Sequence, residues 1–288
     1  MEKKCAIKME NITKRFGSKV IANKDVNLDL YEGEILSLLG ENGSGKTTLM
    51  NMLSGIYFPD EGQIYVHDKP VTIASPKDAF DLGIGMIHQH FKLVDLFTAT
   101  ENIILGLQGK LDLNNARKKV KDICDKYGFD IDPDMKIYDM SVSQKQTVEI
   151  VKVLYRGADI LILDEPTAVL TPQETDKLFT VMRNMKADGK SLIIITHKLH
   201  EVLDVSDRVA VLRKGEYIGD VMTKDANQQS LTDMMVGHSV TLNINRPDPI
   251  NVTPRLKLEG LTVFDELGVK RLDDVSFTIN AGEVLGVA

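Results

Sequence analysis

The sequence predicts an α/β fold with a parallel core sheet and crossover helices, because strand and helix signals alternate through its first two thirds. Three short runs are apolar at nearly every position and rich in leucine or isoleucine, at residues 34–39, 160–163 and 192–195. Such runs are typical of strands that are covered on both faces. We therefore expect these three to be the central strands.

The helices are predicted from their first and last residues. A helix over about 46–53 follows the first strand. Thr171 and Glu174 form a capping box, with proline at the first helical position, and predict a helix to about Lys186. Three further helices are expected from Ser75 toward Leu82, from Asn114 to Tyr127, and from Ser141 to the Gly157 that closes it. Residues 75–155 therefore indicate an inserted helical subdomain.

The pattern changes in the last third. Short strands flank Lys214-Gly215, a helix is expected near 230–236, and residues 241–254 are polar with three prolines, as in a linker. Residues 256–288 set beneath residues 7–39 give 9 identities in 33 positions at a constant offset of 249, which indicates an internal repeat. The second copy stops at Ala288, one position before the counterpart of Gly40. We interpret residues 1–240 as one complete domain and residues 255–288 as the start of a second, incomplete one.

Composition narrows the class of protein. The 288 residues include 35 Lys and Arg against 42 Asp and Glu, a net charge of −7, and 43% are hydrophobic. This is an ordinary globular composition, and the acidic excess argues against a protein that coats nucleic acid. Two cysteines, Cys5 and Cys124, are too few for a disulfide framework and favour a cytosolic setting. The charged first residues do not resemble a secretory signal, and the longest apolar runs are strand-sized, whereas a membrane-spanning helix needs about 18–20 residues.

A phosphate-binding motif lies between the first predicted strand and helix. Residues 40–47 fit G-x-x-x-x-G-K-[ST]. The glycines let successive backbone N–H groups point at phosphate oxygens, Lys46 reaches the β and γ phosphates, and the Thr47 hydroxyl can ligate Mg²⁺. The helix that follows adds the partial positive charge of its N-terminus. The candidate nucleotide-binding residues are Gly40, Glu41, Asn42, Gly43, Ser44, Gly45, Lys46, Thr47 and Thr48.

Polar residues at the ends of the predicted strands are the catalytic candidates. Asp164 ends an apolar strand at the edge of the sheet where ligands bind, so it would hold Mg²⁺. Glu165 follows it and would polarise the attacking water. His197 ends the next strand and could contact the γ-phosphate or be structural. Gln89 could contact metal or water.

The ordered set of motifs resembles the ATP-binding cassette (ABC) ATPases. The resemblance implies a P-loop NTPase fold with a parallel core sheet, an antiparallel β part and an inserted helical subdomain. It also implies ATP and Mg²⁺ as cofactors, with Thr47, Gln89 and Asp164 at the metal. The matching residues are Lys46 of the Gly-rich loop, Gln89 of the Q-loop, Ser141, Val142, Ser143 and Gln144 of the signature, Asp164 and Glu165 of the second nucleotide motif, and His197 as the switch histidine. Phe16 is similar to the aromatic residue that stacks on adenine, or it packs as a core or edge aromatic.

Two features resemble one branch of that family. The tandem repeat and residues 165–171 are similar to the fused ATPases of bacterial importers of simple sugars and nucleosides, and residues 88–94, His90 included, are similar to the nucleoside branch. The implied partners are membrane-spanning permease subunits, a second ABC cassette and, indirectly, an extracytoplasmic solute-binding protein. The implied location is peripheral, on the inner face of the membrane. The alternative is a soluble ABC ATPase that acts on ribosomes or nucleic acid, which the short, non-basic linker disfavours.

The signature departs from the family pattern. Met140 and Ser143 stand where the family has leucine and its fourth-place glycine. Ser143 adds a Cβ where the backbone approaches a phosphate, although serine is small and can donate a hydrogen bond. In the family the signature acts in trans, on nucleotide held by the partner cassette. The resemblance therefore implies low ATP turnover for this chain alone, because Lys46 would need the signature of a second cassette.

Overall fold

The computed structural model describes residues 4–17, 19–89, 91–107, 112–239, 252–266 and 268–286. Most of the expected linker at 241–254 lies outside the described residues, as do His90 and Ala288. The chain divides into two units, Met1–Val240 and Thr241–Ala288. Each unit is described by itself below.

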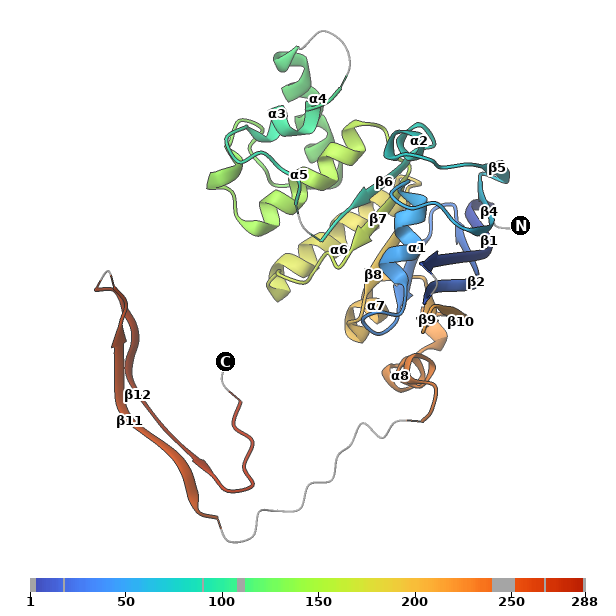
Figure 1. Ribbon diagram of the computed structural model, residues 1–288. Coiled ribbons are helices and arrows are strands. Elements are labelled where there is room, and N and C mark those ends of the chain that lie inside the picture. Colours follow the sequence, from blue (N-terminus) through green and yellow to red (C-terminus); the bar gives the residue numbers. More distant parts are fainter. Residues whose placement is uncertain are drawn as a thin grey trace. The chain divides into compact units, whose positions relative to one another are not determined.

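The core of the first unit is a six-stranded sheet in the order β10-β9-β3-β8-β7-β6 (Figure 1). Five strands run parallel, and only β10 pairs antiparallel, with β9. Every residue of β3, β7 and β8 is buried. The predicted α/β class is therefore confirmed, and the three apolar runs are the central strands. The strand bounds are β3 Ile35–Leu39, β6 Ile84–Ile87, β7 Ile160–Asp164, β8 Ser191–Thr196, β9 Arg208–Arg213 and β10 Glu216–Met222.

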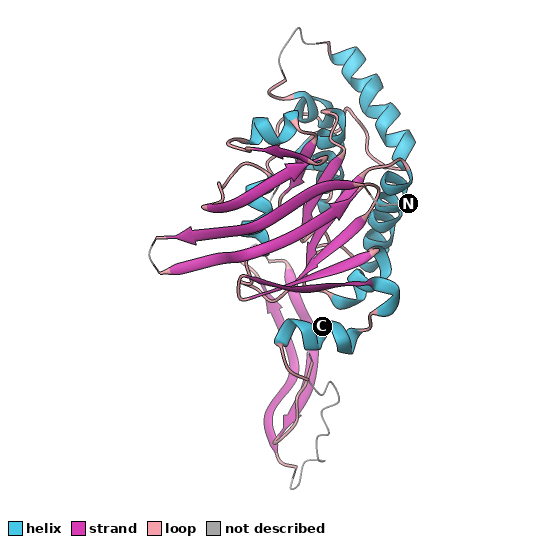
Figure 2. Cartoon of the chain, turned by 90° about the vertical axis from the view of Figure 1, so that its right-hand side faces the viewer, coloured by secondary structure: helices cyan, strands magenta, loops and turns pink. Residues whose placement is uncertain are grey.

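Both faces of this sheet are covered. On one face the side chains of α1 and of a second, antiparallel sheet pack against alternate residues of the central strands. On the other face, alternate residues of the same strands pack against α5 and α6. Figure 2 shows the strands of the first unit with the helices along them. The second sheet has the order β2-β1-β4-β5, with bounds β1 Cys5–Phe16, β2 Val20–Tyr31, β4 Glu61–Val66 and β5 Lys69–Val71.

Helices α3, α4 and α5 pack around a core of their own that includes Ile103, Val120, Val148 and Val151. The sequence does not predict α3, although Thr98 and Glu101 form a complete capping box at its start. It also misses α7, whose N-terminus has no side-chain cap. The helix bounds are α1 Lys46–Leu53, α2 Pro76–Asp81, α3 Ala99–Ile104, α4 Leu113–Tyr127, α5 Val142–Tyr155, α6 Pro172–Ala187, α7 Leu199–Val205 and α8 Gln228–Val236, with short 3-10 turns at Ile137–Asp139 and Thr223–Asp225. Within the described residues, no helix is both long and apolar enough to span a membrane.

The second unit is a hairpin of β11 Pro254–Phe264 and β12 Lys270–Asn280. Its pairing repeats that of β1 and β2 at the offset of 249 residues. Cys5 pairs with Tyr31 and Ile7 with Leu30, while Pro254 pairs with Asn280 and Leu256 with Ile279.

Side-chain contacts repeat at the same offset. Lys8 pairs with Glu10 at 2.6 Å and Lys257 with Glu259 at 2.5 Å. The backbone N–H of Asp25 donates to Thr13 Oγ1, and that of Asp274 donates to Thr262 Oγ1, at 3.1 Å in both hairpins. The sequence repeat is therefore also a repeat of backbone register and local contacts.

Candidate functional site

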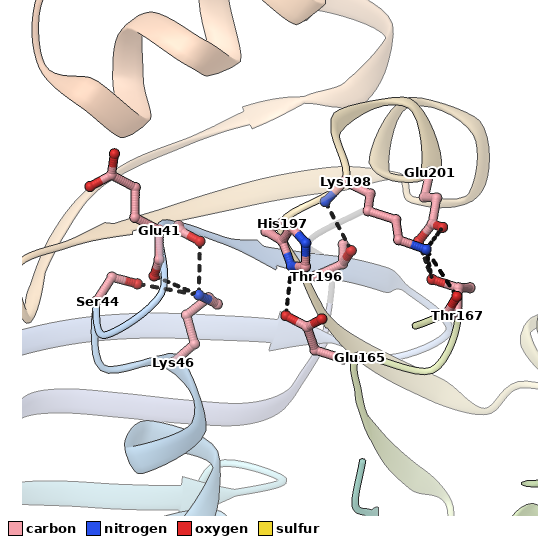
Figure 3. A network of polar contacts seen from close by, with 10 residues as sticks. Glu41, Ser44, Lys46, Glu165, Thr167, Thr196, His197, Lys198 and Glu201 are labelled. Carbon is pink, nitrogen blue, oxygen red and sulfur yellow. Dashed lines mark hydrogen bonds and ion pairs between the residues drawn. The ribbon is translucent and has the colours of Figure 1, made fainter. Parts of the chain in front are cut away.

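The phosphate-binding motif forms the loop between β3 and α1. Lys46, the first residue of α1, is 94% buried, since its relative exposure is 6%. Its Nζ donates to the carbonyl oxygens of Gly40 and Glu41 at 2.8 and 2.9 Å (Figure 3). Burial lowers the pKa of the Lys46 ammonium, while the charges of Glu165 and Asp164 oppose that shift. The lysine therefore lies across the loop, with its ammonium bonded to two loop carbonyls.

The loop conformation requires glycine at its helical end. Gly45 has φ +95°, and a Cβ there would lie 2.3 Å from the carbonyl oxygen of Ala22. The loop thus rests directly on β2. A larger residue at position 45 would displace the backbone that supplies the N–H groups.

A cavity of about 680 Å³ opens beside the loop and brings most of the expected site residues together. Its lining includes the loop from Asn42 to Thr48 and residues from three sheet strands or their ends. Gln89, Asp164, Glu165 and His197 are all in that lining. These side chains come from three separate stretches of sequence, and the parallel strands bring them to the same edge of the sheet as the phosphate loop.

Asp164 and Thr47 form the candidate metal position. Asp164 is the last residue of β7 and is 8% exposed. Burial raises the pKa of its carboxyl, and a hydrogen bond with the Thr47 hydroxyl partly offsets the rise. No cluster of three or more His, Cys, Asp or Glu residues that could hold a metal occurs in the described part of the chain. A hydroxyl and one carboxylate fit Mg²⁺, which prefers hard oxygen ligands and usually takes the rest from phosphates and water.

Glu165 and His197 meet at the mouth of the same cavity. His197 Nδ1 lies 2.8 Å from Glu165 Oε1 (Figure 3). The backbone of Glu165 has φ +49°, a strained conformation for a non-glycine residue, and its N–H donates to the carbonyl of Ile195 at 2.9 Å. The Glu165 carboxylate is therefore held beside His197, at a residue whose backbone is fixed by its own hydrogen bond.

Comparison with known proteins places this geometry in a family. The model of the ABC transporter family matches residues 23–168, just over half of the chain. The chain belongs to the ABC transporter family. The recognition from sequence motifs is thus confirmed.

Two relatives align with nearly the whole of this chain. The nucleoside import ATP-binding protein NupA of Lactococcus lactis is 48% identical over an alignment of 292 positions, which covers 100% of this chain and 58% of NupA. The guanosine import ATP-binding protein NupO of Bacillus subtilis is 48% identical over 98% of this chain and 56% of NupO. This chain therefore spans a little over half the length of these relatives.

Solved ABC cassettes share the fold. The ADP conformation of an ATP-binding cassette from an ABC transporter has a TM-score of 0.72 and 25% identity, over 81% of this chain and 99% of that one. A dimeric bacterial ABC transporter cassette has a TM-score of 0.66 and 27% identity, over 75% and 98%. The fold is therefore that of an ABC ATPase cassette, as expected from the sequence.

The predicted signature residues lie at the start of α5, outside the lining of the phosphate-loop cavity. Ser141 caps α5 in a capping box with Gln144. The hydroxyls of Ser141 and Ser143 are 3.0 Å apart. The Ser143 hydroxyl is the main cause that lowers the pKa of Glu174, on α6. A hydrogen bond of the Ser143 side chain therefore contributes to a contact between α5 and α6.

Phe16 lies at the end of β1 and is 40% exposed. Its ring centroid is 5.2 Å from that of Tyr57, in an edge-to-face arrangement. Gly40, Glu41 and Phe16 do not line the cavity that contains the rest of the loop. An exposed ring of this kind can stack on a base.

Sequence reasoning gave no role to several residues that support the site. Thr167 donates to Glu201 Oε2 at 2.6 Å, and Lys198 Nζ donates to the carbonyl of Thr167 at 2.9 Å and contacts Glu201 Oε1 at 3.0 Å (Figure 3). Gln146, on α5, donates to the carbonyl of Pro166 at 2.6 Å. These contacts hold the segment after Glu165. The i,i+3 spacing of Lys198, the N-cap of α7, and Glu201 is a signal that the sequence did carry.

Proposed function

We propose that the chain is the ATP-binding and hydrolysing part of an ABC importer for a nucleoside or a simple sugar. The observation that carries the proposal is one cavity in which the Glu165–His197 pair faces the phosphate loop. The names of the two relatives above, which refer to nucleoside and guanosine import, favour the nucleoside branch.

The residues have distinct roles in this proposal. The loop amides and Lys46 bind the phosphates of ATP, and Phe16 lies against the base. Thr47, Asp164 and Gln89 hold Mg²⁺, which supplies charge to stabilise the transferring phosphoryl group. Glu165 accepts a hydrogen bond from the attacking water and orients it, and His197 fixes the direction of the carboxylate. Ser141, Val142, Ser143 and Gln144 act on nucleotide held by a partner cassette.

We also propose the organisation around this chain. Residues 1–240 form a first cassette with a helical subdomain at about 75–155, residues 241–254 are a linker, and residues 255–288 begin a second cassette. The repeated hairpin register supports this division. The partners are permease subunits and, through them, an extracytoplasmic solute-binding protein, and the chain binds them at the cytoplasmic face of the membrane.

Nucleotide binding is tested on the chain itself. Titration calorimetry with MgATP should give saturable binding, and Lys46→Ala should weaken it at least about tenfold, because a charged hydrogen bond to phosphate is lost. Glu165→Gln should bind within about twofold of the parent. Phosphate release, measured with a second cassette supplied in the same chain, should fall by about 100-fold or more in Glu165→Gln. Normal hydrolysis by that variant would refute the catalytic assignment.

Transport is tested in cells that lack their own nucleoside uptake. The full tandem protein, expressed with its permease subunits, should cofractionate with membranes and restore uptake of a labelled nucleoside, and the Glu165→Gln form should not. Uptake of a sugar alone would assign the protein to the other branch. Recovery with ribosomes instead of membranes would replace the importer by the soluble alternative.

A further inference from the structure

A buried asparagine on β2 contacts the back of the phosphate loop. Asn23 is 0% exposed, and its Nδ2 donates to the carbonyl oxygen of Gly45 at 3.2 Å. The same carbonyl accepts the first helical hydrogen bond of α1, from Leu49 N–H at 2.9 Å. Gly45 O is therefore held on two sides, by the helix and by β2.

A second contact fixes the preceding peptide. The N–H of Gly215, in the turn between β9 and β10, donates to the carbonyl of Ser44 at 3.1 Å, and the carbonyl of Gly215 accepts from Lys24 N–H at 2.9 Å. Gly215 has φ +82°, and a Cβ there would lie 2.7 Å from Ala22 O. The turn is thus packed tightly between β2 and the loop.

These two contacts determine where two loop amides point. The C=O and N–H of a trans peptide are coplanar and directed oppositely. Ser44 O belongs to the peptide whose N–H is that of Gly45, and Gly45 O belongs to the peptide whose N–H is that of Lys46. With both carbonyls bonded behind the loop, the N–H groups of Gly45 and Lys46 are directed away from β2 and from the turn. Both residues line the cavity beside the loop, and N–H groups fixed in this way bind an anion without reorganisation.

Asparagine at position 23 is unfavourable for the stability of the fold. Its Oδ1 is buried and has no hydrogen-bond partner among the residues that the structure describes. Turning the amide over would set that oxygen against Gly45 O, so the observed orientation is the favourable one. A leucine would fill a similar volume without an unpaired buried oxygen, which costs free energy. Packing alone therefore does not account for an amide at position 23.

We propose that Asn23 is a positioning residue of the phosphate loop, which, with the turn at Gly215, holds the N–H groups of Gly45 and Lys46 in the direction that binds nucleotide phosphates. The proposal rests on the nucleotide-binding function proposed above. It acts through the loop backbone, because Asn23 is not in the lining of the cavity.

The test separates positioning from stability. Asn23→Leu should weaken MgATP and MgADP binding about five- to tenfold, the value of one hydrogen bond, while the denaturant midpoint stays equal to that of the parent or rises. Asn23→Ala should weaken binding by a similar factor but should lower the midpoint, because it leaves a void. Asn51→Leu is the matched control, since Asn51 Oδ1 on α1 is also buried without a partner. It should leave nucleotide affinity unchanged.

A spectroscopic measurement completes the test without nucleotide. In amide NMR spectra, the resonances of Lys46 and Gly45 should shift in Asn23→Leu and Asn23→Ala and stay in place in Asn51→Leu. Unchanged resonances, or parental affinity in both Asn23 variants while Lys46→Ala loses binding, would overturn the positioning role and leave the proposed function intact. A parent chain that binds no MgATP would instead refute the proposed function, and the amide shifts would still decide the effect of Asn23 on the loop.

Discussion

Among individual residues, the candidate site depends on a few side chains whose backbone is either strained or fixed by hydrogen bonds. Glu165 has a left-handed φ of +49° at the end of a buried strand, and its carboxylate is 2.8 Å from His197 Nδ1. Strain of this kind persists only where the surrounding contacts fix it. The contact with His197 and the fixed backbone therefore both restrict the Glu165 carboxylate.

Replacement of His197 tests that orientation. With a second cassette supplied in the same chain, His197→Ala should lower steady-state phosphate release about 100-fold, because the Glu165 carboxylate loses its partner, while MgATP affinity measured by calorimetry should stay within about twofold. His197→Gln should recover part of the rate, since an amide can donate to the same oxygen. Equal rates in His197→Ala and the parent would show that Glu165 does not need the histidine.

The sequence predicted the residues of the site that belong to a local motif and missed those that act across the fold. Lys46 and Asp164 were found because a fixed spacing or a strand end identifies them. Asn23 was missed because its contact with Gly45 joins residues 22 positions apart and follows no motif. The contact of Glu201 with Thr167, 34 positions away, was missed for the same reason.

At the scale of the element, a buried ion pair joins β9 to the start of β3. Arg208 Nε donates to Glu34 Oε1 at 2.8 Å and Nη2 donates to Oε2 at 3.0 Å, with side-chain exposures of 7% and 3%. Burial alone would lower the pKa of Arg208, but Glu34 and Asp220 raise it above the ordinary value. The backbone N–H of Tyr31 also donates to Glu34 Oε2, at 2.9 Å. The pair thus joins the first residue of β9 to the residue that directly precedes β3.

Replacing Arg208 alone should lower the free energy of unfolding more than replacing both Arg208 and Glu34 by uncharged residues. Arg208→Met should lower the free energy of unfolding by about 3–5 kcal/mol, because Glu34 remains buried without its partner. The double variant Arg208→Met/Glu34→Gln should recover most of that loss, since glutamine keeps the acceptor for Tyr31 without a charge. Urea unfolding followed by circular dichroism measures both. A double variant as unstable as the single one would contradict a desolvation cost at Glu34.

Elements were predictable where their signal was local and strong. The three central strands are apolar throughout and were placed correctly, because both faces of the sheet are covered. The second sheet was expected only from the family resemblance. Its first two strands mix buried and exposed residues without a regular alternation, and they pair with several register shifts. Helix α3 has six residues, too few to produce a clear apolar period, although its capping box was present in the sequence.

Across the whole molecule, the two hairpins have the same strand pairing, but corresponding side chains are buried to different extents. Their strand pairing is the same at every register position given for β11 and β12, at the offset of 249. In the first unit Ile7 is 1% exposed and packs in the main core, whereas its counterpart Leu256 is 47% exposed. The same strand pairing therefore occurs with Ile7 buried in the first unit and with Leu256 exposed in the second.

The same substitution in the two hairpins should then have very different costs. Ile7→Ala should lower the free energy of unfolding of the first unit by about 2–5 kcal/mol, because it leaves a cavity among buried side chains. Leu256→Ala, in the second unit, should change the free energy of unfolding measured for the chain by no more than about 0.5 kcal/mol, as is usual for exposed positions. The chain has no tryptophan, so far-UV circular dichroism in a urea titration is the appropriate measurement. A loss of several kcal/mol for Leu256→Ala would mean that this face of β11 is covered in solution, and equal costs at both positions would remove burial as the difference between the two copies.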